Sequence, residues 1–122
     1  MEYKERKPVL WLGDSRKQVQ SFPQPVRQDI GAALYDVQLG ITPPLAKSLK
    51  GVGSGVFEIV TRFDTNTYRT GTVYAVQLGK HVYVLHAFQK KSPTGQKTAK
   101  KDLELIERRY KEAMQLAKEN RS

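Results

Sequence analysis

Three strand-like segments in the second half of the chain restrict its fold more than any other feature. Residues 56–63, 68–78 and 81–88 are rich in β-branched and aromatic side chains. The residues between them, Asp-Thr-Asn-Thr and Gly-Lys, are typical of tight turns. Because strands joined by short turns pair with their neighbours along the chain, these segments predict an antiparallel meander.

The flanking segments predict helices and one further strand. Apolar residues recur at three- and four-residue spacing in residues 23–40 and 98–120, as in helices that pack one face on a core. A strand over residues 8–12, a helix over residues 15–22 and a loop over residues 41–55 complete the expected elements. The order β-α-α-β-β-β-α predicts a small α+β fold, a single domain over residues 1–122. We expect the first strand at the side of the sheet, the two N-terminal helices on one face and the C-terminal helix at the end.

Residues 56–63 alternate between apolar and charged side chains. Phe57, Ile59 and Phe63 alternate with Glu58 and Arg62. This spacing predicts a half-buried strand.

Composition limits the chemistry that the chain can perform. No cysteine occurs in the 122 residues, which excludes disulfides, thiolate metal ligands and cysteine nucleophiles. The first residues do not resemble a secretory signal, and no apolar run approaches the roughly 18–20 residues of a membrane helix. We therefore expect a cytoplasmic protein.

The chain is basic, and its positive charge is unevenly distributed. The net charge is +9, and residues 80–122 contribute 11 lysines and arginines against 5 acidic residues. Such a surface favours polyanionic partners, with nucleic acid the first to consider. The alternative is that lysine-rich helices only keep the protein in solution.

Common enzyme motifs are missing from the sequence. It contains no GxGxxG, no Walker-type phosphate loop and no GxSxG elbow. The glycine-rich residues 51–55 precede a strand, which favours a flexible lead into the sheet over a phosphate-binding loop. His81 and His86 lack the neighbours of a metal site, so no metal is expected. His86 is either a histidine of the sheet face or a catalytic residue.

Basic and aromatic residues are expected to meet at one end of the sheet. In an antiparallel pair, Arg69 at the start of one strand lies near Lys90 and Lys91 at the end of the next. These cations could surround a phosphate, with the faces of tyrosines such as Tyr74 available to a base. Lysines that protect a sheet edge from pairing are an equally good interpretation.

Several segments resemble one family of toxins. They are VLWLGDS, FPQPVRQDIGAALYDVQLG, AKSLKGVGSGVFEI, TYR and, most specifically, LHAFQKKSPTGQKT. Over nearly its whole length the chain is similar to the RelE/ParE superfamily, and within it to the phage-derived, HigB-like branch. The resemblance implies the RelE-like fold and the toxin of a type II toxin–antitoxin system.

The resemblance also implies an activity and partners. Many RelE-like and HigB-like toxins are endoribonucleases that cut mRNA on the ribosome without a metal or cofactor. The 2′-hydroxyl attacks the adjacent phosphate, and basic side chains stabilise the developing charge. The implied partners are mRNA, the ribosome and a cognate antitoxin, expected to be a helix-turn-helix protein.

Matching positions assign the expected site residues. The resemblance implies catalytic roles for Arg69, Lys90, Lys91 and His86, and RNA contacts for Lys50, Tyr74 and Lys97. Lys90 or Lys91 is a candidate for proton transfer.

The chain departs from the family pattern after Arg69. It reads TYRTGTVY, with two extra residues that include Gly71. We expect a bulge or a longer turn there, which would move Arg69 by about 6–7 Å along the strand.

Two other functional classes fit the sequence. One is a non-catalytic protein of the same fold, either a ParE-like gyrase inhibitor or a degenerate phage-derived RNA-binding protein. The other is a simple RNA-binding domain with salt-sensitive affinity. Ribosome-dependent mRNA cleavage distinguishes the toxin from both.

Overall fold

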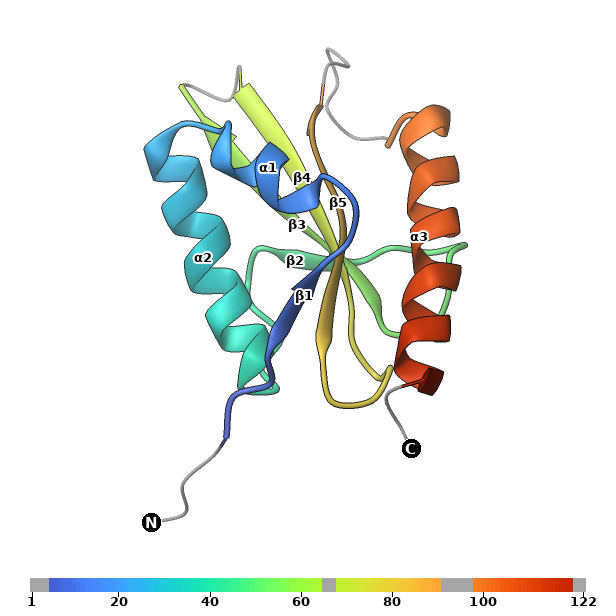
Figure 1. The fold of residues 1–122 in the computed structure, drawn as a ribbon. Helices are drawn as coiled ribbons and strands as arrows, with labels where there is room; N and C mark the ends of the chain where they lie inside the picture. Colours follow the sequence, from blue (N-terminus) through green and yellow to red (C-terminus); the bar gives the residue numbers. More distant parts are fainter. Residues whose placement is uncertain (1–4, 65–67, 91–97, 120–122) are drawn as a thin grey trace.

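A computed structural model describes residues 5–64, 68–90 and 98–119 of the chain (Figure 1). The elements in these residues are β1 (Val9–Trp11), α1 (Ser15–Gln20), α2 (Gln24–Gln38), β2 (Ala46–Ser48), β3 (Val56–Phe63), β4 (Tyr68–Ala75), β5 (Val82–Lys90) and α3 (Lys100–Glu119). None of these helices has the length and apolar composition needed to span a bilayer.

The strands form one mixed sheet in the order β1-β5-β4-β3-β2. The predicted meander of β3, β4 and β5 is confirmed, and β1 joins its side by parallel pairing with β5. β2 was not predicted, because residues 41–55 were expected to be a loop. It is only three residues long and pairs with the first half of β3.

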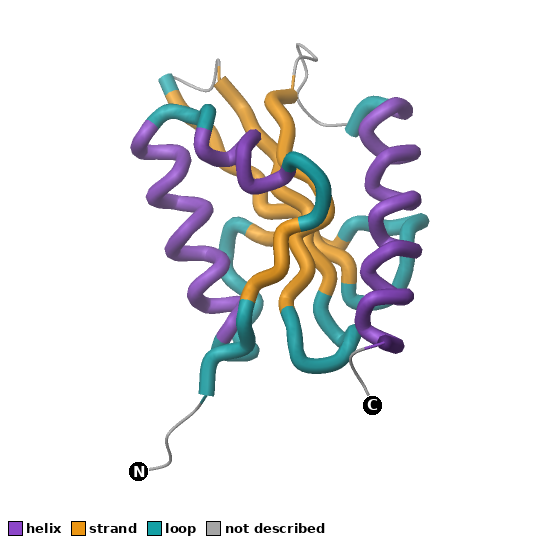
Figure 2. The backbone as a smooth tube through the Cα atoms, viewed as in Figure 1, coloured by secondary structure: helices purple, strands orange, loops and turns teal. Residues whose placement is uncertain are grey.

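Helices cover both faces of the sheet (Figure 2). α1 and α2 lie over one face, as predicted, and α3 lies over the opposite face, not at the end of the sheet. Val26, Ile30 and Leu34 of α2 are buried in the first core, which also contains Ile59 and Tyr74. The second core is made by Leu12, Val56, Val73, Ala75, Tyr83, Leu85, Phe88, Ile106, Ala113 and Ala117. Ala113 and Ala117 of α3 are buried in this core, so the apolar face of the amphipathic helix packs on the sheet.

The helix on the second face explains why β3 is more buried than the half-buried strand that the sequence predicted. Glu58 is fully buried, whereas Phe63 keeps 37% of its surface exposed. Glu58 lies on the face that α3 covers, while Phe63 lies at the end of its strand. Alternation along β3 therefore does not separate a core face from a solvent face.

β5 has an open edge and a bulge. β1 pairs only with Val82–Val84, so among the described residues no strand borders the rest of this edge. Pairing with β4 steps from Val73–His86 to Tyr74–Val84, so Leu85 is an extra residue of β5. The bulge that was expected near Gly71 is not found, because Gly71 pairs in regular register with Val60 and Phe88.

Candidate active site

A pocket of about 740 Å³ lies along the open edge of β5, between α1 and the beginning of α3. Its walls come from three parts of the chain: Gln18, Ser21 and Phe22; Tyr68 and residues 86–90; and Ala99, Lys101 and Asp102. The pocket exists because β1 ends early and leaves the second half of β5 uncovered. Polar and aromatic side chains converge on this pocket, so it is a candidate for a binding site.

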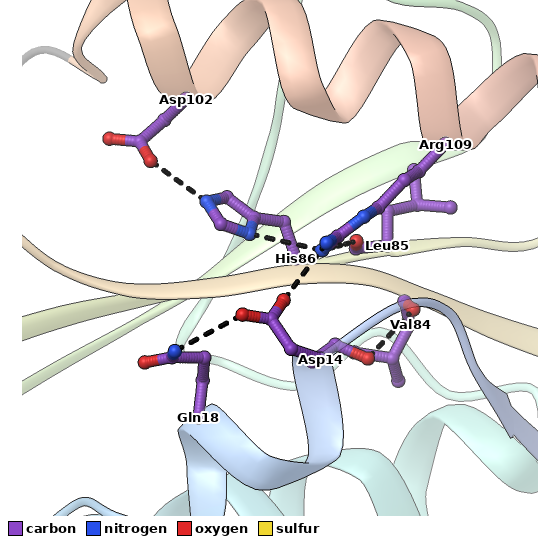
Figure 3. Close-up of polar contacts among 8 residues, drawn as sticks. Asp14, Gln18, Val84, Leu85, His86, Asp102 and Arg109 are labelled. Atoms are coloured by element: carbon purple, nitrogen blue, oxygen red, sulfur yellow. Dashed lines mark hydrogen bonds and ion pairs between the residues drawn. The ribbon is translucent and has the colours of Figure 1, made fainter.

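His86 stands at the centre of a polar network in this region (Figure 3). Its Nε2 lies 2.8 Å from Oδ1 of Asp102, and its Nδ1 lies 3.3 Å from Nη1 of Arg109. The imidazole also stacks on the Phe88 ring, with centroids 5.1 Å apart. Both ring nitrogens are therefore engaged, and only 6% of the residue is exposed.

Arg109 connects the three segments that meet at His86. Its Nη1 donates to the carbonyl oxygen of Leu85 at 3.0 Å, and its Nη2 donates to Oδ1 of Asp14 at 2.9 Å. Gln18 Nε2 donates to the other oxygen of Asp14 at 3.2 Å. The hydrogen bond from Arg109 lowers the pKa of the Asp14 carboxyl below its usual value, against a smaller opposing effect of burial. The start of α1, the bulge of β5 and α3 are thus tied together.

Lys90, which was expected to meet phosphate, is paired inside the protein. Its Nζ lies 2.9 Å from Oε2 of Glu58, and both side chains are 1% exposed. The contact lacks hydrogen-bond geometry, and neither group has another hydrogen-bond partner in the described residues. Lys47 adds a weaker contact 4.0 Å from Glu58 Oε1, from a side chain that is half exposed. Although Lys90 borders the pocket, its charge is largely offset by Glu58.

Arg69 and Lys90 meet across the strands, as the sequence predicted. They are direct partners in the register of β4 and β5, and Arg62 of β3 lies opposite Arg69 on the other side. The extra residues after Arg69 therefore leave it beside Lys90. Arg69 is half-buried at this end of the sheet, and it is not among the residues that line the pocket.

Tyr74 does not have the position expected of a base-stacking residue. It is 1% exposed, belongs to the core beneath α2 and stacks on Phe57 with centroids 5.6 Å apart. Burial raises its pKa to about 12. The expectation was wrong because the faces of the sheet are both covered at this point. Tyr68 is half-buried and lines the pocket, so a ligand in the pocket can reach this tyrosine.

The other expected site residues do not join the cluster. Lys50 is exposed in the β2–β3 connection, beside the end of β3 that lies away from Arg69. Lys91 and Lys97 lie outside the described residues. The structure thus brings Arg69, Lys90 and His86 to one region and leaves Lys50 at the other end of the sheet.

Sequence reasoning missed the acidic and basic partners of His86. Asp102 and Arg109 are seven residues apart on α3, so they lie on one face, in phase with the buried Ile106. Charged residues in phase with an apolar stripe are a signal that could have identified them. Asp14 occupies the N-cap position of α1, but its side chain makes no capping hydrogen bond and bonds to Arg109 and Gln18.

The arrangement is suited to proton transfer beside an anion. A histidine bonded to a carboxylate is a common general acid or base, and Lys101 adds exposed positive charge at the same pocket. Within the described ranges, no three or more histidine or acidic side chains are grouped as metal ligands.

Comparison with known proteins identifies the family of the chain. The model of the family described as Phage derived protein Gp49-like (DUF891) matches residues 17–111, which include every residue that lines the pocket. Comparisons with curated proteins and with solved structures found no match. The match covers well over half of the chain, and the chain therefore belongs to the Gp49-like family of phage-derived proteins, a RelE-like, toxin-like family.

Proposed function

We propose that the protein is the toxin of a type II toxin–antitoxin system, of the HigB-like branch, and that it cleaves mRNA on the ribosome. The observation that carries this proposal is the pocket at the open edge of β5. It combines a histidine–carboxylate pair, an accessible tyrosine and an exposed lysine in a member of a toxin-like family.

The reaction proposed for this pocket is attack of an RNA 2′-hydroxyl on the adjacent phosphate. The 2′-oxygen forms a bond to phosphorus while its proton passes to a base, and the bond to the 5′-oxygen of the next nucleotide breaks as that oxygen gains a proton. The products are a cyclic phosphate and a 5′-hydroxyl. His86 is the proposed proton-transfer residue, while Arg69, Lys91 and Lys101 are proposed to stabilise the negative charge on phosphate.

Lys90 has a different part in this proposal from the one assigned by sequence. Its ion pair with Glu58 opposes the transfer of its charge to a phosphate, because Glu58 would then be left buried without its partner. Its proposed role is therefore to hold the end of β5 in place. RNA contacts by Lys50 and Lys97 remain part of the proposal as outer contacts along the RNA.

The proposed partners follow from the same assignment. The toxin would act in the cytoplasm on mRNA in the ribosome, and a helix-turn-helix antitoxin would neutralise it. The net charge of +9 supports association with ribosomal RNA, and such association should weaken with salt.

A second candidate function is supported by a specific observation. Both nitrogens of His86 are occupied, and the charge of Lys90 is offset, so two of the candidate catalytic residues are engaged within the protein. This favours a non-catalytic protein of the same fold, such as a gyrase inhibitor or an RNA-binding remnant of a phage toxin.

Cleavage on programmed ribosomes tests both functions. Purified parent protein, Arg69→Ala, His86→Gln and a control, Lys118→Ala in the last turn of α3, would be compared at equal concentration. The proposal expects cleavage by the parent and the control, and a loss of at least about 100-fold in the other two, with unchanged circular dichroism. Ribosome binding without cleavage by any of the proteins would support the non-catalytic alternative.

A further inference from the structure

The guanidinium of Arg109 packs against the backbone of Gly13, in space that a side chain at position 13 would fill. Gly13 has a φ of +53°, and a Cβ added there would collide with the guanidinium of Arg109. A residue without a side chain is therefore needed both for the turn and for the approach of Arg109. The Arg109 side chain is 13% exposed, so it is packed within the protein and does not extend over its surface.

The acceptors of Arg109 are also specific to this place. One of them is the carbonyl of Leu85, the extra residue of the β5 bulge. The bulge interrupts the alternation of β5, so Leu85 belongs to the core under α3 while His86 also bonds to α3. Bulges redirect individual side chains in this way, often beside active sites. Arg109 thus holds the distortion that turns His86 toward Asp102.

The contacts of the imidazole determine which nitrogen carries the proton. Arginine can only donate hydrogen bonds, so the nitrogen that faces Arg109 must be the acceptor. Nδ1 faces Arg109 at 3.3 Å, and Nε2 faces the Asp102 carboxylate at 2.8 Å. The two contacts agree only for a neutral ring with its proton on Nε2.

We propose that Arg109 is a positioning residue of the site, which fixes His86 as the Nε2–H tautomer by donating a hydrogen bond to the lone pair of Nδ1. It acts through His86 and does not itself contact the reacting atoms. The role in cleavage rests on the proposed function, whereas the tautomer of the free protein does not.

The tautomer can be read directly by ¹⁵N NMR of the histidine ring in the full chain. The parent is expected to show a protonated Nε2 and an unprotonated Nδ1 at alkaline pH. Asp102→Asn separates the effect of Arg109 on the tautomer from that of Asp102. The asparagine amide can either donate or accept a hydrogen bond, so residue 102 no longer selects which ring nitrogen carries the proton. If Arg109 selects the tautomer, Asp102→Asn keeps it, and the double variant Asp102→Asn/Arg109→Met shows a mixture. A mixture already present in Asp102→Asn, or a single tautomer in the double variant, would overturn the proposal.

Two further variants disturb Arg109 in other ways, so the test does not depend on whether Arg109→Met folds. Arg109→Lys keeps the charge, but an ammonium group cannot reach the three acceptors of Arg109 at once. Gly13→Ala leaves Arg109 unchanged in sequence and displaces its guanidinium by a collision with the added Cβ. Both are expected to give a mixture of tautomers in the Asp102→Asn background. Arg108→Met, an exposed neighbour on α3, is the matched control and should leave the tautomer unchanged.

Kinetics distinguish positioning from RNA binding. Arg109→Met is expected to slow cleavage on ribosomes by at least about tenfold while the affinity for RNA changes by less than about twofold. An equal loss of affinity and rate would mean that Arg109 contacts RNA, and would overturn the assignment. If the parent does not cleave, the proposed function fails, while the NMR comparison still decides whether Arg109 fixes the ring.

Discussion

The ion pair between Glu58 and Lys90 provides the sharpest test of how this structure is stabilised. The perturbation is Lys90→Met, which keeps the length of the side chain and removes its charge. At 2.9 Å, two unit charges attract each other by about 6 kcal/mol if the effective dielectric constant is about 20. Burial of the two ions costs several kcal/mol each, so the net stabilisation by the pair is small. Removal of one partner is different, since the other charge then remains buried.

The expected loss in Lys90→Met is therefore about 3–5 kcal/mol of unfolding free energy. The total stability of a domain is typically about 5–15 kcal/mol, so this variant should be close to unfolding at physiological temperature. Glu58→Met/Lys90→Met removes both charges and should lie within about 1 kcal/mol of the parent, or be more stable. Lys47→Met is the matched control, because Lys47 is half exposed and 4.0 Å from Glu58, and it should cost less than about 1 kcal/mol.

Urea unfolding monitored by circular dichroism measures these differences for the four proteins and the Glu58→Met single variant, which completes the double-mutant cycle. A coupling energy below about 1 kcal/mol would refute the reasoning, because it would show that the pair is not desolvated. The result also bears on function. A loss of cleavage in Lys90→Met alone would report unfolding, whereas cleavage by the uncharged double variant would show that Lys90 is not needed for catalysis.

Three further predictions follow from single groups. Gly71→Ala places a Cβ against the Glu58 carboxylate and 2.9 Å from the Phe88 ring, and should lower the unfolding free energy by about 1–3 kcal/mol in urea titrations. Burial raises the pKa of Tyr74 in the folded protein to about 12. The contribution of Tyr74 to the unfolding free energy is therefore complete below about pH 10 and is lost between about pH 10 and 12. Tyr74→Phe should therefore reduce the loss of unfolding free energy between about pH 10 and 12 by about 2–3 kcal/mol. The same loss of unfolding free energy in this variant and in the parent would contradict the raised pKa of Tyr74. Asp14 has a lowered pKa, so its contribution is present above its unfolded pKa and is lost as the pH falls through the folded value. Asp14→Asn should flatten the dependence of Tm on acid pH, by a small amount because its side chain is 47% exposed.

Features with local causes could be predicted from the sequence. The meander followed from turn residues between β-rich segments, and the buried stripe of α2 followed from its spacing of three and four residues. Arg69 and Lys90 were expected to meet because antiparallel pairing places the start of one strand beside the end of the next, and they are register partners. Each of these inferences depends on neighbours along the chain or on one short connection.

Features that depend on the packing of segments far apart in the sequence could not be predicted. The burial of Glu58 depends on α3 covering the second face of the sheet, and nothing in the alternation of β3 indicates this layer. Tyr74 was assigned to RNA because it follows Arg69 on the same strand. A tyrosine near basic residues in sequence need not lie beside them in space, and Tyr74 lies in the core beneath α2. The partners of His86 are 16 and 23 residues away, so their contact with the ring depends on how the helix packs.

A single glycine connects the pocket with the network around His86. Gly13, with its φ of +53°, lies in the short turn between β1, which ends at Trp11, and α1, which begins at Ser15. Because the chain turns there, β1 pairs with no residue of β5 beyond Val84, and the edge that borders the pocket stays open. The absent Cβ then leaves room for Arg109, which reaches the bulge carbonyl at Leu85 and the ring of His86. The accessibility of the site and the orientation of its histidine therefore have a common origin, so a side chain at position 13 would disturb both even though Gly13 does not line the pocket.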